Sequence, residues 1–234
     1  MHSVCSKSLS FSIYRGDEIM RSLLALLLMF TLSMTLGCQH GSTPIFNGRD
    51  LEGWSGDPGG YAVVDGVLIC GKEGVTNGHP GLLHTKDTFD DFVLDFEFRL
   101  TAGANNGIGI RVPVSGDPAY AGMEIQVLDN SAEVYATLKP YQYHGSIYGV
   151  CAAARGALKP VGEWNRERIV ADGDQIRVIL NGTVIVDYAL TDARLNGTID
   201  GNDHPGIARS GGHIVICGHG DHVEYRNMRV RELK

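Results

Sequence analysis

Apolar and polar residues alternate with a period of two in three segments near the middle of the chain. These segments are FVLDFEFRL (residues 92–100), GIGIRV (107–112) and MEIQVL (123–128). Such alternation is typical of β-strands with one buried face. The pattern predicts that one face of these strands forms a core, and that the other carries Asp95, Glu97, Arg111, Glu124 and Gln126. That polar face is either a solvated exterior or a binding surface.

Further strand-like runs follow the same rule, and no long segment after residue 45 has a helical period. The runs are residues 61–70, 166–173, 175–190, 213–217 and 223–233. Asn181-Gly182 and Asp65-Gly66 predict tight hairpin turns, because both residues of each pair tolerate positive φ. The parity of apolar residues changes in the last run, so we expect a β-bulge near Asn227.

Many short strands separated by turn signals predict an all-β fold, a two-sheet antiparallel β-sandwich. We expect it to span residues 44–233 as a single domain, with residues 131–162 as loops crossing one end. The predicted core includes Leu94, Phe96, Phe98, Ile108, Ile110, Ile125, Val127, Val178 and Ile214.

The N-terminal stretch has the pattern of an export signal. Arg21 precedes an apolar run that ends in Thr35-Leu-Gly-Cys38, which is similar to a bacterial lipobox except that Thr35 stands where Leu is usual. We therefore expect residues 20–38 to be a lipoprotein-type signal peptide with lipidation at Cys38. Residues 1–19 are interpreted as an upstream extension from a mis-assigned start. Ordinary signal cleavage or an uncleaved anchor is the alternative.

Composition narrows the possible partners. The net charge is −7 and there is no basic run, which argues against a nucleic-acid partner. Any contact with a membrane is expected only through a lipid on Cys38. The chain has 31 glycines, which suits tight turns. Beyond the leader, and with Cys38 lipidated, Cys70, Cys151 and Cys217 remain, so at most one internal disulfide is possible and the chain is not a disulfide scaffold.

Several candidate site residues come from the polar face and its neighbours. Carboxylates sharing one surface can act as acid and base, and an arginine can hold a developing negative charge. The candidates are Glu97, Arg111, Glu124, Gln126, the strand-end Asp129, and the neighbouring Asn105 and Asn106. Each alone is a weak signal that a solvated strand face would also explain, but the convergence of several on one face favours a site.

Histidines and tyrosines extend this set. His144 is either a site residue or a turn residue, and Tyr148 lies in the long loop segment, where a ring could stack on a sugar. His213, His219 and His222 could bind a metal only if they converged. We expect a histidine of this group to donate a hydrogen bond to substrate or to cap a loop instead, with His219 as the substrate-binding candidate, and we assign no metal and no other cofactor.

Nine motifs in order resemble one family. They are IFNGRDLEGW (45–54), VVDGVL (63–68), FDDFVLDFEFRL (89–100), NNGIGIRV (105–112), GMEIQVLDN (122–130), HGSIYG (144–149), KPVGEWN (159–165), LNG (180–182) and HGDHVEYRNMRV (219–230). This pattern resembles the DUF1080, or 3-keto-disaccharide hydrolase, family. The resemblance implies a concanavalin A-like jelly roll with ligand on the concave face of one sheet.

Two positions depart from the family pattern. Cys217 stands where the family often has a glutamine, and His144 stands where it commonly has threonine.

Laminarinase-type glycosidases of the same fold use a strand reading roughly E-I-D-x-x-E. Here that strand has Gln126 in place of the middle carboxylate, which argues against ordinary double displacement.

The resemblance implies a hydrolase that removes the acidified C2 proton of a 3-keto-glycoside. In that chemistry Glu124 is the candidate base and Arg111 the candidate stabiliser of the oxyanion, with Asp129, His144 or His219 as acid. The implied partner is a carbohydrate, and the implied location is periplasmic or outer-membrane. A non-catalytic carbohydrate-binding module and a protein-binding lipoprotein are the alternatives.

Lipidation can be tested directly. The native protein should begin at Cys38 and carry lipid mass there, as measured by mass spectrometry of the N-terminal peptide. A Cys38→Ser variant is the matched control and should lack that mass. An unmodified N-terminus at Met1 or Met20 in the native protein would exclude the signal-peptide interpretation.

Overall fold

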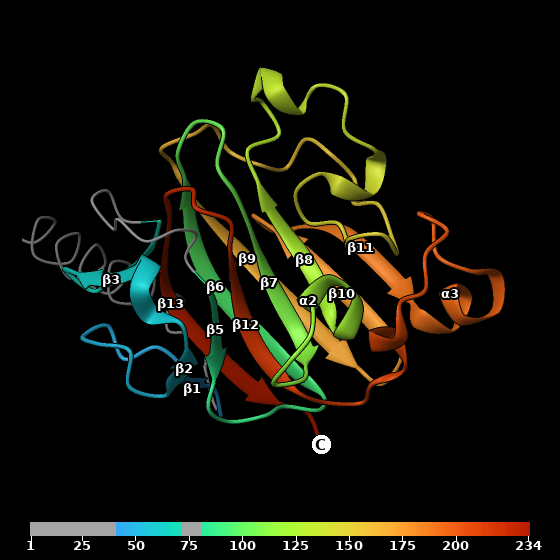
Figure 1. Ribbon diagram of the computed structural model, residues 1–234, viewed down its shortest axis with the longest axis horizontal. Coiled ribbons are helices and arrows are strands. Elements are labelled where there is room, and N and C mark those ends of the chain that lie inside the picture. Colours follow the sequence, from blue (N-terminus) through green and yellow to red (C-terminus); the bar gives the residue numbers. More distant parts are fainter. Residues whose placement is uncertain (1–40, 72–80) are drawn as a thin grey trace, which may run out of the picture. The chain divides into compact units, whose positions relative to one another are not determined.

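Two antiparallel β-sheets pack face to face in the computed structural model (Figure 1). The structure describes residues 41–71 and 81–234, of which Ser42 onwards belong to one compact unit. The two-sheet all-β prediction is confirmed. The predicted N-terminal extension, signal peptide and Cys38 lipidation site lie outside the described residues.

The larger sheet has the strand order β11-β10-β9-β6-β13-β4-β3, with β1 paired to β13. Its strands are β1 (Thr43–Pro44), β3 (Tyr61–Val64), β4 (Val67–Cys70), β6 (Phe92–Leu100), β9 (Trp164–Asp172), β10 (Gln175–Leu180), β11 (Thr183–Ala189) and β13 (Val223–Glu232). Positive φ angles at Asp65 and Asn181 form the two predicted hairpin turns.

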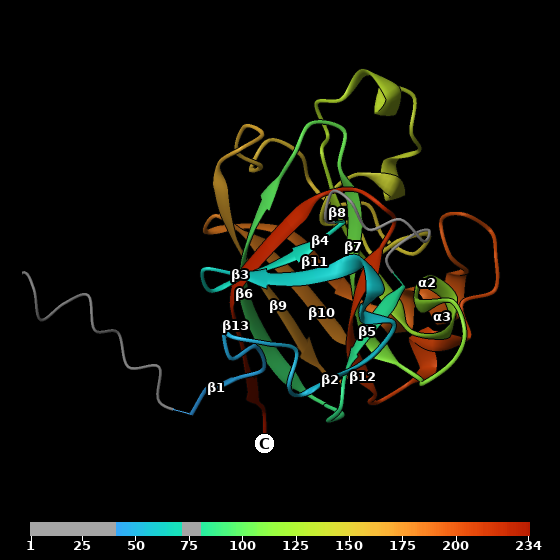
Figure 2. The same ribbon diagram turned by 60° about the vertical axis from the view of Figure 1, so that its left-hand side comes forward.

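The smaller sheet has the order β2-β5-β12-β7-β8. Its strands are β2 (Trp54–Gly56), β5 (Leu82–Thr85), β7 (Asn105–Val112), β8 (Met123–Leu128) and β12 (His213–Gly218). Figure 2 shows its strands β5, β7, β8 and β12 on one side of the sandwich.

Short helices lie in the connections between the strands. They are η1 (Pro58–Gly60), α2 (Pro118–Ala121), η2 (Glu133–Tyr135), η3 (Pro140–Gln142), α3 (Leu190–Asn196) and η4 (Pro205–Ala208). None of the helices formed by the described residues is long and apolar enough to cross a membrane.

The apolar faces of the two sheets form one core. All nine predicted core residues are buried and belong to a single hydrophobic cluster. Burying a large apolar side chain contributes about 1.5–3 kcal/mol. The period-two pattern therefore identified the residues that hold the sheets together.

The three central strands do not share a sheet. β6 lies between β9 and β13 in the larger sheet, whereas β7 and β8 are neighbours in the smaller one. Because their apolar faces meet in the core, their polar faces point to opposite sides of the sandwich. The expected common groove of Glu97 with Glu124 and Gln126 is therefore wrong: Glu97 pairs with Arg226 at 2.7 Å on the larger sheet.

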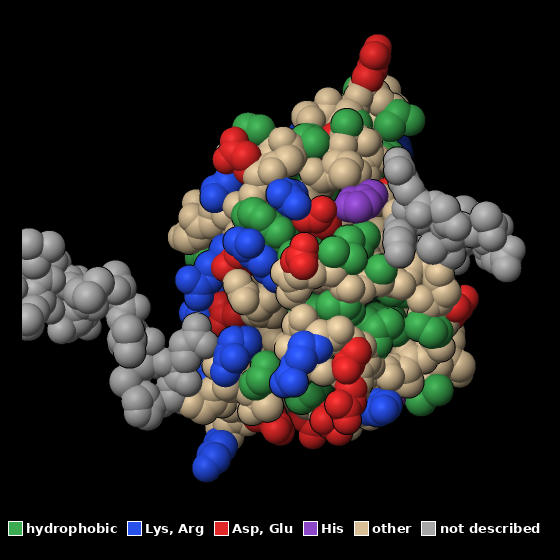
Figure 3. Space-filling model, turned by 90° about the vertical axis from the view of Figure 1, so that its left-hand side faces the viewer, with side chains coloured by type: hydrophobic (Ala, Val, Ile, Leu, Met, Phe, Trp, Pro, Cys, Tyr) green, Lys and Arg blue, Asp and Glu red, His purple; other side chains and the backbone are tan. Residues whose placement is uncertain are grey.

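Ion pairs cover the outer face of the larger sheet around Glu97. Arg168 pairs with Asp95 through two hydrogen bonds, and Arg226 lies over the ring of Trp164, 3.9 Å from its centroid. Figure 3 shows a similar mixture of acidic and basic side chains on the side where β3 lies in Figure 1. The outer face of the larger sheet around Glu97 is therefore a solvated exterior.

Two β-bulges bear on the central strands and on the last one, and a further register shift lies in the β10–β11 pairing between Val178 and Ile179. The predicted one is confirmed: the β6–β13 register shifts between Arg226 and Arg229, and Asn227 has a φ of 54°. The other was not predicted. It lies in β7, where the register with β12 shifts and Arg111 adopts a φ of 52°.

The β7 bulge turns Arg111 away from the outer face of its sheet. The guanidinium donates to Asp91 Oδ1 at 2.8 Å and to the Gly173 carbonyl at 2.9 Å. Asp91 directly precedes β6 and Gly173 lies in the β9–β10 turn, so Arg111 ties the two sheets together. Beyond the bulge, Val112 joins Val215 and Cys217 in a small separate cluster, and the main core does not include it.

Removing this tie should destabilise the fold. Arg111 is only 2% exposed, so Arg111→Ala deletes buried charged hydrogen bonds and should lower the free energy of unfolding by at least about 2 kcal/mol. Arg177→Ala is the control, because its pair with Asp187 is exposed and should be worth less than about 1 kcal/mol. Urea denaturation measures both, and equal losses would contradict the structural role.

Candidate functional site

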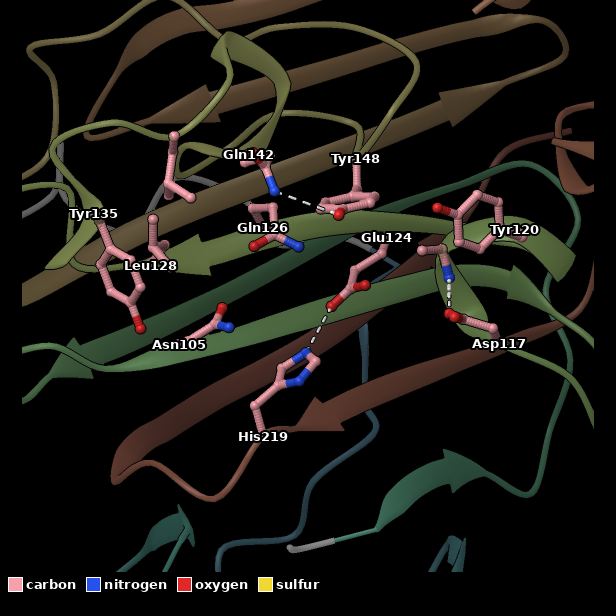
Figure 4. Close-up of a pocket in the computed structure, with 12 residues that line it drawn as sticks. Asn105, Asp117, Tyr120, Glu124, Gln126, Leu128, Tyr135, Gln142, Tyr148 and His219 are labelled. Atoms are coloured by element: carbon pink, nitrogen blue, oxygen red, sulfur yellow. Dashed lines mark hydrogen bonds and ion pairs between the residues drawn. The ribbon is translucent and has the colours of Figure 1, made fainter. Parts of the chain in front are cut away.

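A polar pocket lies over the outer face of the smaller sheet, above β7 and β8 (Figure 4). Its volume is about 360 Å³. The lining residues are Asn105, Asp117, Ala119, Tyr120, Glu124, Gln126, Leu128, Tyr135, Leu138, Gln142, Tyr148 and His219. Carboxylates, amides and tyrosines thus converge on one space.

The strands supply the floor of the pocket. Alternation along β8 directs Glu124 and Gln126 outward, while Ile125 and Val127 face the core. Gly107 of β7 leaves room for the Glu124 carboxylate: a Cβ on Gly107 would lie 2.0 Å from Glu124 Oε1. A glycine at this position is therefore required if Glu124 is to keep its orientation.

The segment after β8 forms one wall. It runs back along the free edge of β8, where Gly145 donates its N–H to the Gln126 carbonyl at 2.8 Å and Tyr148 donates to the Glu124 carbonyl at 2.9 Å. These backbone bonds hold Tyr148 alongside Glu124, and both residues line the pocket. Gln142 then donates to the Tyr148 hydroxyl at 3.4 Å.

Helix α2 forms the opposite wall. Asp117 is its N-cap and accepts from the Ala119 N–H at 3.0 Å, and Pro118 occupies the first helical position. The helix brings Asp117 and Tyr120 to the pocket. Burial raises the pKa of Tyr120, with further contributions from nearby Tyr148 and Asp200, so this hydroxyl keeps its proton.

Glu124 and His219 form a carboxylate–imidazole pair in the pocket. Glu124 Oε1 and His219 Nε2 are 3.4 Å apart, and the Glu124 side chain is 7% exposed while that of His219 is 45% exposed. The hydrogen bond to Glu124 raises the pKa of His219 above its usual value, although burial opposes this. The pair combines an acceptor and a donor at the pocket floor.

Cys217 lies beneath the pair. Burial raises the pKa of its thiol well above the ordinary range, and the neighbouring charge and hydrogen bond of Glu124 act in the same direction. The thiol therefore stays protonated.

The structure brings five of the sequence-predicted residues together at this pocket. They are Asn105, Glu124, Gln126, Tyr148 and His219. Glu97 and Arg111 are excluded from it by the strand order and the β7 bulge described above.

Three further sequence-predicted candidates, Asp129, Asn106 and His144, lie outside the pocket lining and make hydrogen bonds within the fold. Asp129 accepts hydrogen bonds from Ser131 and from the Gly103 N–H. Although burial opposes ionisation, these bonds hold its pKa below the usual value, so it is a poor acid. Asn106 faces the core, where it accepts from the Tyr225 hydroxyl at 2.7 Å.

His144 also points into the core. Its ring packs 5.0 Å from that of Phe98, and its Nδ1 accepts from the Leu128 N–H at 3.3 Å. Its Nε2 is 3.0 Å from Glu167 Oε2, and both side chains are buried. The roles expected for Asp129, Asn106 and His144 at the site are therefore wrong.

Several lining residues were not predicted, including Asp117, Tyr120, Tyr135 and Gln142. The Asp117-Pro118 pair is a recognisable helix start, and it could have indicated that a short helix interrupts the strands before β8. Nothing in the local pattern indicates that this helix folds over Glu124. The described residues contain no group of three or more His, Cys, Asp or Glu side chains that could hold a metal ion.

Comparison with known proteins defines the family. The model of the 3-keto-alpha-glucoside-1,2-lyase-like domain matches residues 41–231. The chain belongs to this family. This confirms the resemblance noted from the nine motifs, which spans nearly the same residues.

Individual relatives agree with this assignment. The chain is 27% identical to a 3-keto-disaccharide hydrolase of Bacteroides thetaiotaomicron, over 82% of this chain and 79% of the relative. A crystal structure of a provisionally assigned glycosyl hydrolase from Parabacteroides distasonis has 31% identity and a TM-score of 0.70, covering 82% of this chain and 99% of the other. A Bacillus subtilis protein with a galectin-like fold has 13% identity and a TM-score of 0.54, covering 82% and 94%, which supports the jelly roll alone.

The Glu124–His219 pair has a spectroscopic signature. Glu124→Gln removes the charge that raises the pKa of His219, so the midpoint of the His219 imidazole titration should fall to lower pH. Titration by NMR measures this shift, with the signals of the other histidines as the internal reference. An unchanged His219 midpoint would show that the two side chains do not interact in solution.

Proposed function

We propose that this protein is a hydrolase of 3-keto-glycosides that cleaves the glycosidic bond by base-assisted elimination followed by addition of water. One observation carries this proposal: Glu124 and His219 form a carboxylate–imidazole pair on the floor of a polar pocket, in a chain of this family. The similarity to a 3-keto-disaccharide hydrolase and to a glycosyl hydrolase supports a glycosidase-type enzyme with a carbohydrate substrate.

The reaction needs a base and a donor near C2 and C3 of the sugar. A ketone at C3 acidifies the C2 hydrogen, so a base removes that proton and the C–H electron pair becomes an enolate. The enolate then expels the C1 substituent, which leaves with a proton from an acid. Water adds across the resulting double bond and restores the 3-keto sugar.

The pocket offers residues for each role. Glu124 is the base, because its carboxylate lines the pocket and is held there in the space that Gly107 leaves for it. His219 takes the roles that Arg111, Asp129 and His144 cannot fill, since its raised pKa keeps the ring cationic to higher pH. A cationic ring can stabilise an enolate oxygen or protonate a leaving group.

The remaining lining suits a sugar. Asn105, Gln126 and Gln142 provide amide donors and acceptors for hydroxyl groups, and Tyr120 and Tyr148 provide rings from opposite walls. Asp117 is a second carboxylate, but one of its oxygens already caps α2. An ordinary two-carboxylate glycosidase mechanism is therefore less well supported than proton abstraction at C2.

Export with a lipid on Cys38 also remains part of the proposal. The residues concerned lie outside the described part of the chain, so it rests on the sequence pattern alone.

Turnover of a 3-keto-disaccharide tests the mechanism. Glu124→Gln should lower kcat by about 10²- to 10⁴-fold, because the amide keeps the shape but cannot accept the C2 proton. The parent should cleave the unoxidised disaccharide poorly, since its C2 hydrogen is not acidic. Rates are measured by product release for both sugars side by side, and binding by calorimetry.

The control is Glu163→Gln, which changes an exposed carboxylate outside the pocket and should keep parental rates. Full activity of Glu124→Gln would exclude Glu124 as base. Equal cleavage of both sugars would favour an ordinary glycosidase. Binding of both sugars without cleavage would favour a carbohydrate-binding module.

A further inference from the structure

A buried histidine–carboxylate pair lies behind the α2 wall of the pocket. Asp200 Oδ2 and His204 Nε2 are 3.0 Å apart, and their side chains are 2% and 0% exposed. The other ring nitrogen, Nδ1, lies 3.0 Å from the Ala119 carbonyl. A carbonyl oxygen can only accept, so Nδ1 carries a proton and donates to Ala119.

Asp200 is itself firmly held. Burial opposes its ionisation, but hydrogen bonds from the Asn202 backbone and from His204, Asn202 and Thr198 side chains lower its pKa to about 2. The carboxylate is therefore charged at neutral pH. Facing Nε2, it holds the imidazole in the orientation that aims Nδ1–H at Ala119.

His204 does not line the pocket itself but contacts α2, which does. Ala119 lies within this four-residue helix, and the neighbouring Tyr120 lines the pocket (Figure 4). The His204 ring also stacks on the Tyr120 ring, with centroids 4.6 Å apart and planes 31° apart. One imidazole thus fixes both the backbone and the aromatic ring of this wall.

Two glycines show how closely the pair is packed. A Cβ on Gly149, which has a φ of 71°, would lie 2.5 Å from both Asp200 Oδ2 and His204 Nε2. Gly149 follows Tyr148, so the pair also abuts the opposite wall. A Cβ on Gly206 would lie 2.0 Å from the Gly122 carbonyl at the end of α2. The segment that carries Asp200, His204 and Gly206 can therefore shift little without moving the walls of the pocket.

We propose that His204, held by Asp200, is a positioning residue that sets the orientation of α2 and of Tyr120 over the base Glu124. The effect on turnover rests on the proposed function. A misplacement of about 1 Å at a reacting centre can cost about 10²-fold in rate. His204 acts through Ala119 and Tyr120, since it donates to the first and stacks on the second.

Two amide variants separate the two hydrogen bonds. His204→Asn places an N–H donor close to the position of Nδ1, and so can still bind Ala119. His204→Gln places its donor near Nε2, and so keeps the partner Asp200 but loses Ala119. We expect His204→Gln to lower kcat on the 3-keto-disaccharide about 10- to 100-fold with KM changed less than about threefold. His204→Asn keeps the Ala119 hydrogen bond but loses Asp200 and the Tyr120 ring, so it should lower kcat clearly less than His204→Gln does.

The control is His213→Gln. His213 also has its Nδ1 near a backbone carbonyl, that of Thr85 at 2.8 Å, but it does not line the pocket. It should keep the parental kcat. Thermal unfolding of all variants separates positioning from lost stability: if kcat falls in proportion to Tm in both His204 variants, the proposal is overturned.

Hydrogen exchange gives a readout that does not depend on turnover. Amides of residues 117–122 should exchange faster in His204→Gln than in the parent, and His204→Asn should restore most of the protection. Unchanged exchange in His204→Gln would overturn the proposal. If the parent cleaves no 3-keto-glycoside, the proposed function fails, and exchange in this segment still decides whether His204 holds α2.

Discussion

The packing of the β6 apolar face against those of β7 and β8 is the interaction on which the rest depends. Phe96 and Phe98 from the larger sheet share one buried cluster with Ile108 and Ile125 from the smaller one. Because side chains alternate along a strand, burying this set necessarily sends Glu124 and Gln126 to the outside of the smaller sheet. The pocket floor is thus a direct consequence of the core, and only its walls need loops and α2.

The sequence pattern predicted the core well because burial depends mainly on parity within a strand. Parity does not state which strands are neighbours. Glu97 and Glu124 each lie on the polar face of their own strand, yet β6 and β8 belong to different sheets. The bulge at Asn227 was visible as a change of parity between two apolar sets, whereas the bulge at Arg111 lies near a strand end, where too few residues follow to reveal the shift.

The candidate site was harder to predict because buried polar residues have the same types as catalytic ones. His144 lies against Glu167 in the core, Asn106 accepts from Tyr225, and Asp129 closes a loop. Asn106 and Asp129 satisfy polar groups of the fold, and His144 accepts from the buried Leu128 N–H, so each hydrogen bond would cost stability if left unmade. The sequence alone could not separate these from Glu124 and His219, since the difference lies in whether the side chain opens into a pocket.

The environment of Glu124 explains how one carboxylate can be both fixed and available. Gly107 leaves the space that the carboxylate fills, and His219 occupies only one of its oxygens among the contacts described above. Cys217 adds a protonated thiol, which is a weaker hydrogen-bond donor than a side-chain amide. In the proposed mechanism, strong donors on every lone pair of Glu124 would compete with the substrate proton. A weak donor below and a titratable donor beside Glu124 hold it in place while leaving it able to accept a proton from the pocket.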